Sequence, residues 1–503
     1  MLTVVYTPQM SPPQAGRPVL HRIRLLASDS VVYGLSGIIA RFLSAWLVPV
    51  YTRLFTPADY GVMSLITSTT TLLGIFVVLA LDNSAARWYW DTEDSDQRRR
   101  SIASGAWGQF AAASLAGLAL FVLADQVANR VIRVPDAGKY FRLCALTLPL
   151  NQFVVVSVNW LRMRRRPVAT TVFTLGVALG QIGLTLLFVV GFRWGLTGVY
   201  RAQVLTLAGA AMTAIALMRD WLNPRHFRMT RLREMLRFAL PLIPTAIAVW
   251  VVSFADRYFI QRYSGVVEVG LYGVGYALAQ VLALLTGAFQ QAWGPFALSI
   301  HTEPDARQTY ANVFLVYVTV TAIAATGLSL FAPEAIRIVA TDRYAGASTV
   351  VGLLSLSYVV IGLTYIAAIG PTIMKTNRDI GIALTVAALL NVVLNLVFVP
   401  RYGKIGSAAA TLISQSLTPI YLFTRAQKLY PIPYRFGSGI ALLAAAVAII
   451  AAGTLLPTHR PLLTIAAKIG LVLLFVPLLL YLRLIPFEGW RALFPSMRVS
   501  TPP

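Results

Sequence analysis

The stretch LNVVLNLVFVPRYGKIGSAAATLIS, residues 390–414, decides how the rest of the chain is interpreted. An apolar run ends at residues 400–403, PRYG, and a second apolar run opens at residues 406–410, GSAAA. Two membrane helices joined by a very short turn have this pattern. Asn391 and Asn395 lie four positions apart, so we expect them on one face of the first helix.

A similar turn, RWGLTG, occurs earlier at residues 193–198. Arg193 and Arg401 are 208 positions apart, and the motif Tyr-Gly-Val at residues 60–62 returns 212 positions later at residues 272–274. Both offsets correspond to six spans, and an even number keeps the two halves in the same orientation. The sequence therefore predicts a parallel repeat, an architecture typical of transporters that bind cargo between two bundles.

The composition is that of a membrane protein, since 57% of the 503 residues are hydrophobic and 12% are charged. Apolar segments recur along the chain, each long enough to cross an apolar core about 30 Å thick. We expect an all-α polytopic membrane protein with two parallel-repeat six-helix bundles plus two accessory C-terminal helices. The predicted spans are about 30–50, 61–82, 102–124, 140–161, 168–191, 197–218, 238–261, 269–292, 309–331, 348–373, 380–400, 406–426, 438–456 and 463–482.

The net charge of +23 would suggest nucleic acid in a soluble protein, but cytoplasmic loops of membrane proteins also collect Lys and Arg. With the N-terminus inside, 26 of the 42 Lys and Arg residues fall in inside segments, so we expect both termini in the cytoplasm and no nucleic-acid partner. The expected divisions are a basic disordered tail, an N-terminal bundle, a basic linker, a C-terminal bundle, two accessory helices and a tail: 1–27, 28–218, 219–237, 238–426, 438–482 and 483–503.

Four stretches occur in order along the predicted spans. They are YTRLFTPADYG at 51–61, LDNSAAR at 81–87, ADRYFI at 255–260 with GLYGV at 270–274, and residues 391–410. Together they resemble the Wzx-like polysaccharide and O-antigen flippases, the polysaccharide transport branch of the multidrug/oligosaccharidyl-lipid/polysaccharide exporter superfamily. Each motif alone is short, and the ordered set carries the resemblance.

This resemblance implies a multi-pass protein of the bacterial inner membrane that acts as a flippase and not as an enzyme. Its cargo would be a polyprenyl-diphosphate-linked oligosaccharide repeat unit, moved by alternating access for O-antigen, capsule or exopolysaccharide synthesis. The implied partners are the lipid bilayer and the polymerase and chain-length proteins of the same pathway. No cofactor is implied. Transport would be coupled to a proton or sodium gradient.

Charges deep in the predicted spans are the candidates for contacts with an anionic diphosphate. Arg41 lies about 17 Å into the first span, where an arginine costs roughly 2.5–3.5 kcal/mol on insertion scales. It would contact phosphate or glycan, or else pair with a carboxylate such as Asp256. Asp256 and Arg257 lie near the outer interface, where Arg257 would line a cavity or extend to the interface as an anchor. Asp256 is a candidate proton or sodium site, with no partner visible in the sequence.

Asp82 and Arg87 lie at the cytoplasmic end of the second span. Arg87 is placed to meet an incoming phosphate, or it is a cytoplasmic anchor beside Asp82. Asp82 is the second candidate for ion coupling. Arg53 and Arg201, near the outer surface, complete the charged cavity candidates.

The two asparagines of the opening stretch, Asn391 and Asn395, are polar residues in an otherwise apolar helix. They would bind sugar hydroxyls, or they would form hydrogen bonds between helices, worth about 0.6 kcal/mol on average. Pro241 and Pro244 lie within the seventh span and remove backbone donors, which allows a kink there, although membrane helices also tolerate proline.

The sequence is also compatible with other functions. These are a drug/cation antiporter or a lipid II flippase of the same superfamily, or a membrane-embedded glycosyltransferase or polymerase. An enzyme of that last kind usually has a large extramembrane loop with clustered carboxylates. The longest internal loop, 219–237, contains only Asp220 and Glu234 as acids. The single cysteine, Cys144, and four scattered histidines predict no metal centre, and no catalytic constellation is present in the sequence.

Overall fold

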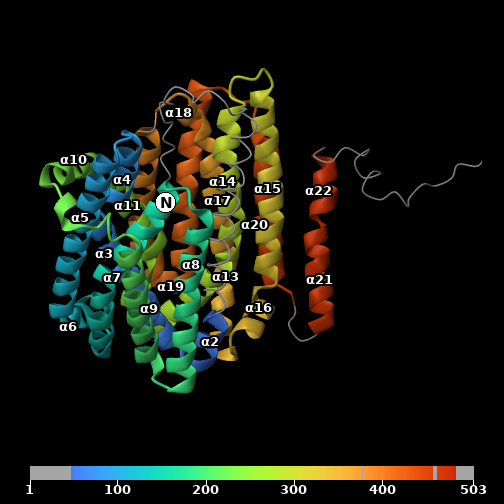
Figure 1. Cartoon of the computed structure of the whole chain (residues 1–503). Helices are drawn as coiled ribbons and strands as arrows, with labels where there is room; N and C mark the ends of the chain where they lie inside the picture. The colour runs from blue at the N-terminus through green and yellow to red at the C-terminus, as the bar shows by residue number, and fades with distance from the viewer. Residues whose placement is uncertain (1–46, 377, 457–460, 483–503) are drawn as a thin grey trace, which may run out of the picture. The chain divides into compact units, whose positions relative to one another are not determined.

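The computed structural model describes residues 47–376, 378–456 and 461–482, and these residues form helices and no strands (Figure 1). Eleven helices among them are long and apolar enough to cross a membrane. The number becomes twelve when the bent pair α13 (Val266–Ala279) and α14 (Val281–Ser299) counts as one span. The chain is an all-α polytopic membrane protein, as its composition predicts.

The number of spans, fourteen, stays a prediction. The first predicted span, 30–50, lies mostly outside the described residues. Two others, 380–400 and 406–426, fall within one element, α19 (Arg378–Leu429), which joins two helices across a kink. Gly403 marks that kink with φ 53° and ψ −134°, a conformation that glycine adopts at low steric cost.

The described helices divide into two compact units. The first contains the described residues up to Gly273 together with Ala388–Ser407, and the second contains Val274–Ala387 together with the residues from Ala408 onward. Helices α13 and α19 therefore contribute residues to both units. The predicted domain boundaries are drawn from a repeat in the sequence, whereas these units are defined by compactness. The predicted boundaries therefore remain a prediction.

The described part of the first unit consists of helices of unequal length joined by short connections. Its elements are α2 (Leu47–Leu54), α3 (Pro57–Val78), α4 (Leu81–Trp90), α5 (Ser95–Val122), α6 (Ala124–Gln126), η1 (Val127–Ile132), η2 (Pro135–Ala137), α7 (Gly138–Met163), α8 (Pro167–Leu186), η3 (Leu187–Gly191), α9 (Gly195–Leu217), η4 (Pro224–His226), α10 (Met229–Ala239), η5 (Leu240–Leu242), α11 (Ile243–Trp250), η6 (Val251–Ala255), α12 (Asp256–Ser264) and parts of α13 and α19.

Small residues let the helices of the first unit approach closely. A Cβ atom added to Gly117 of α5 would lie 2.7 Å from the backbone oxygen of Ala145 in α7. Membrane helices use such small residues because apolar lipid gives no hydrophobic drive for helix association, and close van der Waals packing replaces it. The chain changes from α-helix to a 3₁₀ turn at η5, which contains Pro241, so the backbone is irregular where the prolines allow a kink.

The second unit has its own core. Its elements are α14, α15 (Ala306–Leu330), α16 (Ala332–Val339), η7 (Asp342–Ala347), α17 (Ser348–Ala367), α18 (Ile369–Ile373), α20 (Phe436–Thr454), α21 (Pro461–Leu473), α22 (Phe475–Tyr481) and the remaining parts of α13 and α19. Lys468 of α21 is buried and donates to both carboxylate oxygens of Glu334 in α16, at 2.6 and 2.8 Å. This ion pair joins the accessory helix α21 to α16.

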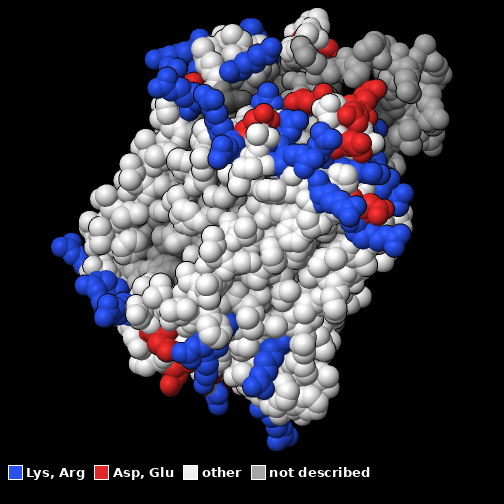
Figure 2. Space-filling view, turned by 60° about the vertical axis from the view of Figure 1, so that its left-hand side comes forward, with Lys and Arg blue, Asp and Glu red and all other residues white. Residues whose placement is uncertain are grey.

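Figure 2 turns the part of the molecule that carries α5, α6 and α10 toward the viewer. On this face, Lys and Arg gather near two opposite ends, and a broad band without charged residues lies between them. Such a band is what a helix bundle presents to lipid, since charges at the bilayer centre are costly.

Candidate functional site

A π-helical turn, η6, interrupts the long helix of the first unit between α11 and α12. π-turns widen a helix by one residue and occur frequently at functional sites. This turn ends directly before Asp256 and Arg257, the first residues of α12. Both side chains are almost fully buried, with exposed fractions of 1% and 4%.

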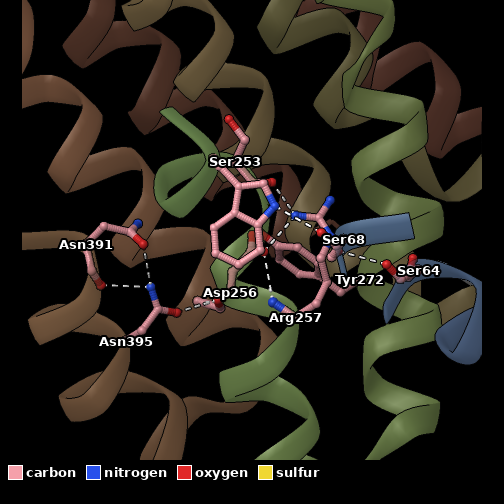
Figure 3. Close-up of polar contacts among 10 residues, drawn as sticks. Ser64, Ser68, Ser253, Asp256, Arg257, Tyr272, Asn391 and Asn395 are labelled. Carbon is pink, nitrogen blue, oxygen red and sulfur yellow. Dashed lines mark hydrogen bonds and ion pairs between the residues drawn. The ribbon is translucent and has the colours of Figure 1, made fainter. Parts of the chain in front are cut away.

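Asp256 and Arg257 form an ion pair, with Nη1 of Arg257 lying 2.6 Å from Oδ1 of Asp256 (Figure 3). Oδ1 also accepts from the backbone N–H of Arg257 at 2.9 Å. The hydroxyl of Tyr272 in α13 donates to the other carboxylate oxygen, Oδ2. Nη1 also donates to the backbone oxygen of Ser253 in the π-turn. The guanidinium is thus held by a carboxylate and a carbonyl, and the aspartate by three donors.

Aromatic rings enclose the guanidinium of Arg257. Its central carbon lies 5.1 Å from the ring centre of Phe254 and 5.5 Å from that of Tyr272, distances that suit cation–π contacts. A buried ion pair of this kind is weak support for stability by itself, but removal of one partner costs about 3–5 kcal/mol because the other charge stays buried.

Two further hydrogen bonds fix this helix against α3. Nε1 of Trp250 donates to the backbone oxygen of Ser68 at 3.0 Å, and the hydroxyls of Tyr258 and Thr69 lie 2.7 Å apart. The bonds flank the ion pair along the sequence, on either side of Asp256. They hold the irregular segment in one position relative to α3.

Asn391 and Asn395 form a second polar cluster, in the part of α19 that belongs to the first unit. Both are fully buried. Nδ2 of Asn395 donates to the backbone oxygen of Asn391 at 2.8 Å and to its Oδ1 at 3.1 Å, and Ser407 donates to Oδ1 of Asn395 at 2.6 Å (Figure 3). The amides therefore link the two sides of the turn at residues 400–403. The prediction that Asn391 and Asn395 lie on one face of the helix is confirmed.

Helix α3, which contains the first Tyr-Gly-Val motif, packs closely against the part of α13 just before the second motif. A Cβ atom added to Gly61 of α3 would lie 2.0 Å from the backbone oxygen of Val266, and one added to Gly270 of α13 would lie 1.8 Å from that of Pro57. Only glycine permits this approach. Close by in α13, Glu268 pairs with Lys404 of α19 at 2.7 Å. Gly61 of the first motif and Gly270, two residues before the second, thus set the helix crossing that carries Tyr272.

The second carboxylate of interest, Asp82, lies in α4. Its Oδ1 accepts from Nε2 of Gln109 in α5 at 2.7 Å, and Asn159 of α7 also forms a side-chain hydrogen bond with it. Asp82 forms no ion pair with any residue in the described ranges. The partners of Asp82 are thus the side-chain amides of Gln109 and Asn159, whereas Asp256 is bound by the guanidinium of Arg257.

The remaining predicted residues do not join these clusters. Arg41 lies outside the described residues. Arg53 of α2 and Arg201 of α9 are exposed, and Arg201 lies 4.8 Å above the ring of Trp194. Arg87 of α4 is 45% exposed and pairs with Asp91 at 3.7 Å rather than with Asp82. Their roles toward cargo stay predictions.

The structure corrects two expectations. Arg257 does not extend to an interface: its side chain is buried, because Asp256 and the Ser253 carbonyl accept its donors. Asp256 has partners that sequence reasoning missed, Arg257 beside it and Tyr272 sixteen positions later. Tyr272 belongs to the repeated motif, so the repeat was the signal that would have drawn attention to it.

Gln109, Asn159 and Ser407 were also missed. Each is a polar side chain in an apolar stretch, and such residues in membrane helices usually mark a contact inside the bundle. No group of three or more His, Cys, Asp or Glu that would hold a metal ion is found within the described ranges.

Comparison with known proteins agrees with this architecture. A profile described as "Polysaccharide biosynthesis protein" matches residues 26–301, more than half of the chain. The chain belongs to this family. The match includes Asp82, Asp256 and Tyr272.

One relative of this family member is the succinoglycan biosynthesis transport protein ExoT of Rhizobium meliloti (strain 1021), 23% identical over 316 residues. The alignment covers 62% of this chain and 61% of ExoT, so it spans less than two thirds of that protein. The name describes a transport protein in polysaccharide synthesis and not an enzyme.

Solved structures share the fold. The lipid II flippase MurJ in an inward closed conformation superimposes with a TM-score of 0.70 at 14% identity, covering 90% of this chain and 99% of MurJ. An inward-facing multidrug resistance MATE family transporter of the MOP superfamily gives a TM-score of 0.62 at 13% identity, covering 77% and 94%. Since these identities are low, the likeness concerns the fold alone, which is that of membrane transporters.

Proposed function

We propose that this protein moves a polyprenyl-diphosphate-linked oligosaccharide from the cytoplasmic to the outer leaflet of the bacterial inner membrane. Membership of the polysaccharide biosynthesis protein family supports this proposal, as does similarity to a succinoglycan biosynthesis transport protein. The fold, shared with a lipid II flippase, supports a flipping step. The product would be O-antigen, capsule or exopolysaccharide, made together with polymerase and chain-length proteins.

The observation that carries the proposal is the buried Asp256–Arg257 pair, bonded to Tyr272 inside an apolar unit. Charged groups within membrane helices are costly and mark substrate or ion pathways. A guanidinium binds phosphate with paired, charge-assisted hydrogen bonds, so a diphosphate competes with Asp256 for Arg257. The ion pair is thus suited to exchange partners during transport.

We infer the following cycle from this exchange. When Arg257 turns to the diphosphate, Asp256 loses its cationic partner and takes up a proton or a sodium ion. Release of that ion restores the pair and displaces the cargo. A ligand shifts a conformational equilibrium only through different affinity for the two states, and the opened pair supplies this difference. The asparagine cluster near residues 391–407 would contact glycan or hold the helices together, and the lipid tail stays in the bilayer.

Two other cargoes fit the same fold. Lipid II is also a polyprenyl-diphosphate-linked saccharide, and MATE family transporters are named for multidrug resistance. A cationic drug would bind an unpaired carboxylate, whereas a diphosphate requires a guanidinium. Asp256 is paired with Arg257, so this cluster favours anionic cargo over cationic drugs.

The test uses a strain that lacks the gene, complemented with the wild type or with Arg257→Gln at matched membrane levels. We expect the deletion to abolish surface polymer and to accumulate lipid-linked repeat units on the cytoplasmic face, and Arg257→Gln to do the same. Arg201→Gln, with its exposed side chain, is the comparison variant. Normal polymer with increased drug sensitivity in the deletion strain would overturn the proposal in favour of drug export. Cell lysis on depletion, with lipid II accumulating, would identify lipid II as the cargo.

A further inference from the structure

The helical span that contains α3 and α4 breaks without glycine or proline. Leu79 and Ala80, between the two helices, have φ angles of 48° and 52°. Left-handed backbone is strained for residues with a Cβ atom, and two in succession are unusual. Such strain persists only where surrounding contacts determine the conformation.

Gln109 of α5 supplies a contact of this kind. Its side chain is buried, and Nε2 donates both to the backbone oxygen of Val78, at 3.2 Å, and to Oδ1 of Asp82, at 2.7 Å. Val78 is the last residue of α3 and Asp82 lies in the first turn of α4. One amide group therefore links the two sides of the break. The carbonyl that it satisfies belongs to the end of α3, where carbonyls have no partner within the helix.

A cavity of about 20 Å³ lies beside the Asp82 carboxylate. Its polar lining consists of Asp82, Gln109 and Asn159, and the other lining residues are apolar. This volume is enough for one water molecule or a small ion, since a single water requires about 10–15 Å³ on this measure. The cavity thus has room for one small guest next to a carboxylate with no cationic partner within the described ranges.

Asp82 is the one titratable group that lines the cavity. From α5 and α7 the lining is apolar apart from Gln109 and Asn159, and the residues of α10 packed beside Leu81 are apolar as well. The nearest charged side chain along α4, Arg87, pairs with Asp91 at the C-cap of the helix. Any added positive charge at this site is therefore held by Asp82.

We propose that Asp82, in this cavity lined also by Gln109 and Asn159, binds one small monovalent cation, a proton or Na⁺, and that its occupancy sets the geometry of the α3–α4 break. Hard cations prefer oxygen ligands, and the Asp82 carboxylate supplies them here. A bound cation competes with the Gln109 amide for the Asp82 carboxylate, so binding releases the link across the break.

The movement would extend to α10. Ser84 of α4 donates to the backbone oxygen of Met235 at 3.0 Å, and Leu81 packs against Leu232 and Met235. A change at the break therefore moves α4 and α10 together. That this site contributes to the energetics of transport rests on the proposed function, whereas the site itself rests on the geometry of α3, α4, α5 and α7.

Hydrogen exchange of the purified full-length protein in nanodiscs, without cargo, tests the site independently of transport. We expect the protection factors of residues 75–86, corrected for the pH dependence of intrinsic amide exchange, to change at least threefold on raising Na⁺ from zero to about 100 mM at constant pH, or on moving between about pH 5 and pH 8 without Na⁺. The first response identifies Na⁺ and the second a proton. Asp91→Asn, at the C-cap of α4, is expected to respond like the wild type.

Asp82→Asn is expected to abolish either response, since the amide keeps the shape of the side chain but not its charge. Gln109→Leu provides a second variant: it removes the link, so the segment should exchange rapidly under every condition. The proposal is overturned if residues 75–86 of the wild type respond to neither Na⁺ nor pH. It is also overturned if Asp82→Asn still responds. Either result would count against the cation site alone, since normal transport by the wild type would leave the proposed function standing.

Discussion

Asp256 and Asp82 are both aspartates of membrane helices in the first unit, and both follow an irregular backbone. A π-turn precedes Asp256, and a left-handed break precedes Asp82. Their partners differ, since Asp256 is held by a guanidinium and a phenol, whereas Asp82 is held by two amides beside a small cavity. A charge that is already compensated must exchange its partner to act, and an uncompensated one needs only an added cation.

This difference predicts different responses to substitution. At Asp256 the cost of a variant should depend on whether a charge is left unpaired. At the Asp82 break, the cost should depend on backbone strain and on the amide link.

The largest effect is expected for Arg257→Ala, which leaves the Asp256 carboxylate buried without its cation. We expect a loss of about 3–5 kcal/mol in the free energy of unfolding, measured in mixed micelles. The double variant Asp256→Asn/Arg257→Gln removes both charges and should recover most of this loss. If the free energy of unfolding of Arg257→Ala lies within about 1 kcal/mol of the wild-type value, the ion pair is not the dominant contact of this site.

The next effect concerns the helix that carries Tyr272. Gly270→Ala would place a methyl group 1.8 Å from the Pro57 oxygen, so we expect α13 to shift and unfolding to become easier by about 1–3 kcal/mol. Gly74→Ala in α3 is the matched control, because nothing lies within 4 Å of the added Cβ atom. Equal effects of the two substitutions would contradict a glycine-dependent crossing.

Asn395→Ala tests the amide cluster. It removes the bonds to Asn391 and leaves the hydroxyl of Ser407 without its acceptor. Hydrogen bonds between membrane helices average about 0.6 kcal/mol with a maximum of about 1.7 kcal/mol, and we expect a loss in this range. Asn83→Ala, at an exposed position, should change the unfolding free energy by less than about 0.5 kcal/mol. Transport assays would then separate packing from glycan contact.

The smallest effect is expected at the break. Ala80→Gly relieves left-handed strain of roughly 1–2 kcal/mol and loses about 0.5–1 kcal/mol of backbone entropy, for a net gain of about 0.5–1 kcal/mol. Ala86→Gly, within the regular part of α4, should instead destabilise by about 1 kcal/mol. A loss of stability in Ala80→Gly would show that the break is not strained.

Much of the fold could be predicted because apolar length is a local property of the chain. The turn at Gly403 and the shared face of Asn391 and Asn395 also follow from short-range spacing. Lys468 shows the limit of such reasoning. By itself a lysine in an accessory span would extend toward the interface, but its partner, Glu334, lies 134 positions earlier, so Lys468 is buried.

The sequence by itself determined an all-α membrane protein, a repeated motif and the residue types that chemistry would use, since hydropathy and spacing are written in neighbouring residues. Tertiary structure alone decided which charges are compensated. Tyr272 reaches Asp256 from another helix, Gln109 and Asn159 reach Asp82 from two others, and the break at Leu79 and Ala80 has no glycine or proline to announce it. The energy of a buried charge depends on its neighbours in space, and only the packing of helices brings those neighbours together.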